Sequence, residues 1–295
     1  MLTEQTATEL FRAPPHRFVD VAGGQIAVRS VGEGPDVLFV HGWPVTGATW
    51  RKLLPHLAPH VTCHVLDLAG TGASRFDADT PIGMEHHMAA VRAAVDALEL
   101  DSVAVVGHDS GGMIARHAMV GDPRLRALGL INTEQPQGVG WWFKGFLIGR
   151  HIPGFGALLR WVLDKPVLRR SPFVLGGSFV DRSLIDGDFD ELFLRPLVDD
   201  DAQYRAAMDL LQSFDEEHVR QLAAIHARLH VPVQMVWGAE DPFFPLDWAQ
   251  EMVGTFPDAR LTVIERASLM PHEEKPKEVA AALLDVLRGA ARRAA

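Results

Sequence analysis

The residue best placed to do chemistry in this sequence is an aspartate at a sharp turn. The apolar, β-branched residues 103–106 predict a buried parallel strand, and an apolar helical pattern follows from Met113. Between them, at 107–112, stands Gly-His-Asp-Ser-Gly-Gly, in which two glycines flank Asp109 at the spacing of a nucleophile elbow. The nucleophile position of that frame falls on Asp109. The plainer interpretation is an aspartate that caps a helix.

The elements that must position this turn are strands alternating with helices. We expect a hairpin over 18–31, strands over 37–40, 61–66, 127–132, 231–238 and 260–265, and helices over 49–57, 84–98 and 277–287. This alternation predicts an α/β fold with a mostly parallel, twisted sheet of about eight strands and helices on both faces.

The alternation stops near Gln135. From there to Leu229 the aromatic and aliphatic residues recur at mixed helical spacing, and Pro and Gly interrupt them. We therefore expect a core in two parts, residues 1–134 and 230–295, with a helical cap over 135–229. Residues 1–16 are polar and contain prolines, so we expect them to form a loosely held arm.

Three motifs in this order make the chain resemble the α/β-hydrolase fold family over nearly its whole length. They are His-Gly-Trp-Pro at 41–44 after the third strand, Asp-x-x-Gly-x-Gly-x-Ser at 67–74 after the fourth, and the elbow after the fifth. An elbow with Asp in place of Ser is similar to the branch that holds epoxide hydrolases and dehalogenases. In that branch a carboxylate attacks an sp³ carbon, and water activated by a histidine then hydrolyses the ester.

The resemblance implies a role for each site residue. Asp109 would be the nucleophile, and the backbone N–H groups of Trp43 and Ser110 would form the oxyanion hole. The acid that orients the histidine would be Asp241, which follows the strand ending near residue 238. Glu134, after the sixth strand, is the alternative.

The histidine departs from the family pattern. Aligning the Glu and Pro that follow it places Leu269 where the resemblance expects the imidazole, and His272 comes three residues later. We therefore expect either that His272 serves as the base from the start of the next helix, or that the base is missing.

The residues around the motifs favour one reaction over another. Trp43 fits the His-Gly-(Phe/Trp)-Pro of epoxide hydrolases, and Tyr204, the single tyrosine, could protonate the epoxide oxygen. Ser110 stands where haloalkane dehalogenases commonly have Trp. We expect an epoxide hydrolase acting on a small to medium hydrophobic substrate. The alternatives are a haloalkane or haloacetate dehalogenase, and a degenerate member that binds or rearranges a hydrophobic metabolite.

The net charge and the residue counts limit which kinds of partner and cofactor this chain is expected to bind. The formal net charge of −10 argues against nucleic acid and against anionic membrane surfaces, so we expect neither as a partner. One cysteine, Cys63, and no signal-peptide pattern favour the cytoplasm. The histidines form no spaced metal set, so we expect no metal and no cofactor. A homodimer is an open expectation.

Overall fold

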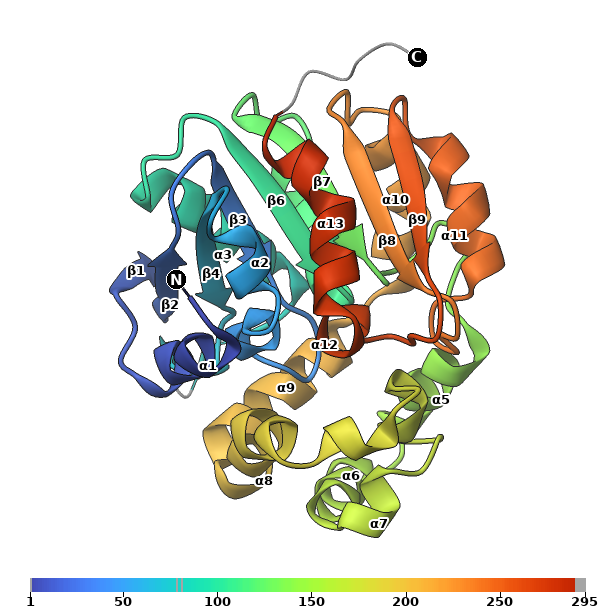
Figure 1. The fold of residues 1–295 in the computed structure, drawn as a ribbon. Helices are drawn as coiled ribbons and strands as arrows, with labels where there is room; N and C mark the ends of the chain where they lie inside the picture. Colours follow the sequence, from blue (N-terminus) through green and yellow to red (C-terminus); the bar gives the residue numbers. More distant parts are fainter. Residues whose placement is uncertain (1, 78, 81, 290–295) are drawn as a thin grey trace.

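The computed structural model describes residues 2–77, 79–80 and 82–289 of the chain (Figure 1). One sheet runs through it, with the strand order β1-β2-β4-β3-β6-β7-β8-β9 and a short β5 paired to β2. The strands are β1 (Arg17–Val21), β2 (Gly24–Val31), β3 (Asp36–Val40), β4 (Thr62–Asp67), β5 (Arg75–Phe76), β6 (Val103–His108), β7 (Leu125–Ile131), β8 (Val233–Gly238) and β9 (Ala259–Ile264). From β4 to β9 in this order every neighbouring pair is parallel, as the alternation of strands and helices predicts.

Helices cover both faces because alternate strand residues point to opposite sides. Val105 packs into the core that holds α3 and α4, whereas Val106 packs into the core that holds α2 and α13. The helical elements of this part are α1 (Glu4–Arg12), η1 (Gly47–Trp50), α2 (Leu54–Leu57), α3 (Met84–Ala97), α4 (Ser110–Met119), α11 (Leu246–Met252), η5 (Val253–Thr255), α12 (Pro271–Glu274) and α13 (Pro276–Leu287).

The chain between β7 and β8 is helical, and its part from α5 to α9 lies beyond the carboxyl ends of the parallel strands (Figure 1). Its elements are α5 (Trp141–Gly149), α6 (Phe155–Asp164), α7 (Pro166–Arg169), η2 (Gly176–Ser178), η3 (Arg182–Ile185), η4 (Asp190–Leu194), α8 (Arg195–Asp199), α9 (Asp201–Ser213) and α10 (Glu216–His226). We call the part from α5 to α9 the cap. The last of these helices, α10, packs against α4.

The expectation of a loose N-terminal arm is wrong, because α1 is a capped helix. Thr3 and Thr6 form a reciprocal capping box at its start. The guanidinium of Arg29 then holds the far end, donating to the backbone oxygens of Leu10 (3.0 Å) and Ala13 (3.2 Å). A capping box usually has Glu or Gln at the third helical position, and here that residue is Thr6, so the usual sequence pattern does not reveal the box.

Candidate active site

The turn after β6 has the geometry of a nucleophile elbow. Asp109 lies between β6 and α4 with φ 53° and ψ −138°, a strained conformation for a residue with a side chain. A Cβ at Gly107 would stand 2.5 Å from Gly112 Cα, and one at Gly111 would stand 2.3 Å from the carbonyl oxygen of Val40. Only glycine fits at 107 and 111, which explains the spacing that the sequence shows.

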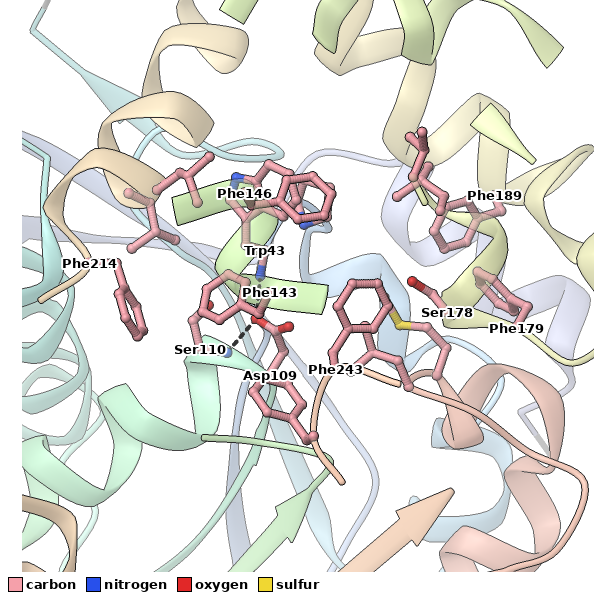
Figure 2. Close-up of a pocket in the computed structure, with 18 of the residues that line it drawn as sticks. Trp43, Asp109, Ser110, Phe143, Phe146, Ser178, Phe179, Phe189, Phe214 and Phe243 are labelled. Atoms are coloured by element: carbon pink, nitrogen blue, oxygen red, sulfur yellow. Dashed lines mark hydrogen bonds between the residues drawn. The ribbon is translucent and has the colours of Figure 1, made fainter. Parts of the chain in front are cut away.

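The two oxygens of the Asp109 carboxylate have different surroundings. Its Oδ1 accepts hydrogen bonds from the backbone N–H groups of Trp43 (3.2 Å) and Ser110 (Figure 2). Within the described residues, Oδ2 has no hydrogen-bond donor. Burial raises the pKa of Asp109 to about 6, and the two N–H groups and then the Ser110 hydroxyl offset part of that rise. The carboxylate is therefore fixed by one oxygen and open at the other.

Asp109 lies at the floor of an apolar cavity between the sheet and the cap. Seven phenylalanines contribute to the walls of this cavity. Asp109, Ser110 and Ser178 are its polar lining residues, and Asp109 is the titratable one among them. Such a cavity suits a small to medium hydrophobic molecule with few polar groups.

No histidine belongs to the cavity lining, and Leu269 and Met270 form the wall that follows β9. His272 is fully buried elsewhere. Its Nε2 is 2.8 Å from Thr49 Oγ1, and its ring lies 5.0 Å from that of Trp50. Burial lowers its pKa to about 3, so the ring is neutral. The structure thus brings Leu269, not His272, to Asp109's cavity.

His108 contacts both the loop that carries Leu269 and the buried ring of His272. Its ring lies 4.5 Å from that of His272, and its Nε2–H donates to the Leu269 carbonyl oxygen at 2.9 Å. Burial holds the pKa of His108 well below its usual range. This neutral pair packs beneath the loop and fixes where Leu269 lies.

Asp241 is buried after β8 and is held without an imidazole. Its Oδ2 accepts from Asn132 Nδ2 at 2.7 Å, and its Oδ1 accepts from the backbone N–H groups of Phe243 (2.7 Å) and Phe244 (3.2 Å). Burial raises its pKa to about 7. No sequence pattern marks Asn132, which comes directly after β7.

Glu134 is buried behind the elbow and is not a lining residue of the cavity. Burial, and then the charge of Asp109, raise its pKa to about 7. Thr133 Oγ1 lies 2.8 Å from the Asp109 carbonyl oxygen and 2.9 Å from Glu134 Oε2, and it accepts from Arg116 at 2.9 Å. The Thr133 hydroxyl has one proton, and if it donates that proton to the Asp109 carbonyl oxygen it can only accept from Arg116 and Glu134. All three contacts are therefore hydrogen bonds together only when Glu134 is protonated and donates to Thr133.

Tyr204 lies outside the cavity lining. Its hydroxyl donates to the Gly156 carbonyl oxygen within the cap, and the Arg160 guanidinium lies 5.1 Å from its ring centre. Ser178 lines the cavity instead, and Figure 2 shows its oxygen turned inward. This cap hydroxyl was missed because a serine after two glycines carries no catalytic pattern.

Among the described residues, no three His, Cys, Asp or Glu side chains are grouped so that they could hold a metal ion. Over the same part of the chain, no helix combines the length and apolar character needed to cross a membrane.

Residues 37–282 match the model of the Alpha/beta hydrolase family. The pimeloyl-[acyl-carrier protein] methyl ester esterase of Xanthomonas campestris pv. campestris is 39% identical over 101 residues, which are 34% of this chain and 38% of that enzyme. The match therefore spans little more than a third of that relative. The Chromobacterium violaceum enzyme of the same name is 26% identical over 265 residues, 88% of this chain and 97% of the relative.

Solved structures share the fold. The epoxide hydrolase CorEH superposes with a TM-score of 0.77 at 22% identity, covering 92% of this chain and 97% of that one. Haloalkane dehalogenase DbeA from Bradyrhizobium elkani gives 0.75 at 23% identity, with the same coverage of both chains. At these identities the likeness extends to the architecture of sheet and cap.

Proposed function

Because this chain belongs to the alpha/beta hydrolase family, we propose that it is a hydrolase whose Asp109 carboxylate opens an epoxide of a small to medium hydrophobic substrate. The observation that carries the proposal is the asymmetry of the carboxylate. Oδ1 accepts from two backbone N–H groups, while Oδ2 is left without a donor at the floor of the apolar cavity. A nucleophile needs one oxygen held and the other free.

In the first step, Oδ2 attacks a ring carbon of the epoxide. A C–O bond to Asp109 forms, the ring C–O bond breaks, and the alkoxide takes up a proton from water. Ser178 would donate a hydrogen bond to that oxygen, since its hydroxyl faces the cavity. In the second step water adds to the ester carbonyl, the N–H groups of Trp43 and Ser110 stabilise the oxyanion, and a diol leaves.

The second step would be slow. It needs a base to take a proton from water, and no histidine belongs to the cavity lining. Asp241 and Glu134 are acids near the elbow, but neither belongs to the cavity lining. We therefore expect the aspartyl ester to build up.

Two other hydrolase activities receive less support. A dehalogenase needs donors for the departing halide, and the indole N–H of Trp43 is already donated to the Ala207 carbonyl oxygen at 2.9 Å. The esterase activity named for the curated relatives would need a serine with a histidine base. This chain has Asp109 and Leu269 at the corresponding places.

A second candidate is a member that binds or rearranges a hydrophobic metabolite without hydrolysis. Leu269 in the cavity wall is the observation that favours it. Asp109 would then act as a general base, for which a pKa of about 6 is suitable near neutral pH. Under this alternative an epoxide would still alkylate Asp109, but no diol would follow.

The role of Ser178 can be tested against that of Tyr204. We expect Ser178→Ala to slow ester formation from an aryl epoxide by roughly tenfold, the value of one lost hydrogen bond. Tyr204→Phe should change that rate little, because its hydroxyl donates within the cap. Ester formation is followed by intact-protein mass spectrometry.

A bromoalkane with the same carbon skeleton is the control: bromide is a much better leaving group than an alkoxide and needs no proton, so Ser178→Ala should slow its displacement far less than it slows epoxide opening. If Tyr204→Phe were the variant that slowed epoxide opening, the hydrogen bond assigned to Ser178 would be wrong.

A further inference from the structure

One carboxylate joins the cap to the loop that follows β9. Glu274 is the last residue of α12, which lies where the core meets the cap (Figure 1). Its Oε1 accepts hydrogen bonds from the backbone N–H groups of Val180 (2.8 Å) and Asp181 (3.1 Å) in the cap. Its Oε2 accepts from the backbone N–H of Ser268 (2.7 Å) in the loop. Among the described residues this carboxylate makes no ion pair, so its contacts serve to hold two stretches of backbone together.

Two further hydrogen bonds join the same two stretches. Ser268 Oγ donates to the Gly177 carbonyl oxygen at 2.7 Å, the nearer of its two acceptors. The backbone N–H of Met270 donates to the carbonyl oxygen of Ser178 at 3.2 Å. We call these two hydrogen bonds, together with the three that Glu274 accepts, the cap clamp.

The two stretches that the cap clamp joins, 177–181 and 268–270, both contribute to the active-site cavity. Ser178 and Leu269 line the cavity beside Asp109 (Figure 2). The Ser178 hydroxyl has no hydrogen-bond partner among the described residues, so no bond of its own holds it there. Its position is therefore set by the backbone of 177–181, which the clamp holds on the loop.

We propose that Glu274 is a positioning residue that keeps the Ser178 hydroxyl at the cavity by holding the cap on the loop after β9. Glu274 is not itself a lining residue of the cavity, so it acts through Ser178. A carboxylate suits this role because both of its oxygens accept hydrogen bonds and it has no proton to place. The consequence for Ser178 rests on the proposed function, but the clamp itself does not.

The first test compares the rates at which Asp109 is labelled by an aryl epoxide and by the bromoalkane of the same carbon skeleton. Glu274→Ala should lower the ratio of the epoxide rate to the bromoalkane rate by roughly threefold to tenfold, because the epoxide oxygen loses the hydrogen bond from Ser178. When Ser178→Ala is already present, Glu274→Ala should lower this ratio no further, since there is no hydroxyl left to position. A purely structural role would slow both reactions together, and equally in both backgrounds.

Glu274→Gln is the conservative variant for this comparison. Its amide oxygen can still accept from the N–H groups of Val180 and Asp181, but its NH₂ group cannot accept from that of Ser268. The ratio of rates should therefore lie between those of Glu274→Ala and the wild type. Glu278→Ala, the same truncation at an exposed position on α13, is the matched control and should give the wild-type ratio.

Hydrogen exchange tests the clamp without any reaction. In Glu274→Ala the amide protons of Val180 and Asp181 should exchange roughly tenfold faster, while those of the buried strand β6 should keep their wild-type rates because the variant is folded. Wild-type protein that is not labelled at Asp109 would defeat the proposed function, and exchange alone would then decide on the clamp. Unchanged exchange at Val180 and Asp181 would overturn the proposal. So would an unchanged ratio of labelling rates in Glu274→Ala when the wild type is labelled.

Discussion

Leu269→His should speed hydrolysis of the aspartyl ester by a hundredfold to ten-thousandfold, roughly what a positioned general base contributes. Leu269 lines the cavity after β9, and Asp241 follows the neighbouring strand β8. An imidazole at 269 would therefore lie in the cavity wall, on the loop next to the strand that Asp241 follows. The measurement is the decay of the epoxide adduct on the variant, followed by intact-protein mass spectrometry.

His272→Ala is the control for this experiment. It should leave the decay of the adduct at the wild-type rate, because His272 lies against Thr49 and Trp50 and not in the cavity lining. It should lower the free energy of unfolding by roughly 2–4 kcal/mol, as the loss of a buried ring does. An unchanged decay rate in a folded Leu269→His variant would contradict the account of the missing base.

Asp109→Asn should abolish labelling by the epoxide and make the protein more stable at pH 8. The pKa of Asp109 is raised by burial from 3.8 to about 6, a gap worth about 3 kcal/mol. The folded chain binds this proton more tightly than the unfolded chain does. Stability is thus fully present below pH 3.8 and is lost as the pH rises through about 6. The amide carries no charge and avoids that loss.

Urea unfolding at pH 3.5 and pH 8 measures the difference between Asp109→Asn and the wild type. It should be close to zero at the lower pH and up to about 3 kcal/mol at the higher. Asp285→Asn, the same substitution at an exposed position on α13, is the matched control. Equal stability of Asp109→Asn and the wild type at pH 8 would mean that the buried carboxylate carries no energetic cost.

The sequence predicted those parts of the site that depend on local geometry. The glycines around Asp109 are required by close backbone contacts, and Trp43 follows a strand whose end is fixed by the same sheet. The sheet itself followed from alternating patterns, except for β5, which has only two residues.

The parts of the site that could not be predicted from the sequence depend on packing between segments that are far apart in the chain. His272 is three residues from the expected place, but Pro271 starts a new helix there, and this carries the imidazole to Thr49. Ser178 reaches the cavity because the cap folds over the sheet, and Asn132 meets Asp241 because β7 and β8 are neighbours. The spacing of residues along the chain does not indicate these contacts.

The most direct test of the central claim is the mass of the wild-type protein during reaction with a small aryl epoxide. We predict an adduct of one epoxide on Asp109 that forms faster as the pH rises through about 6, and then persists while diol appears slowly. Steady formation of diol with no adduct would contradict this account, because a base would then be at work in a cavity whose lining contains no imidazole.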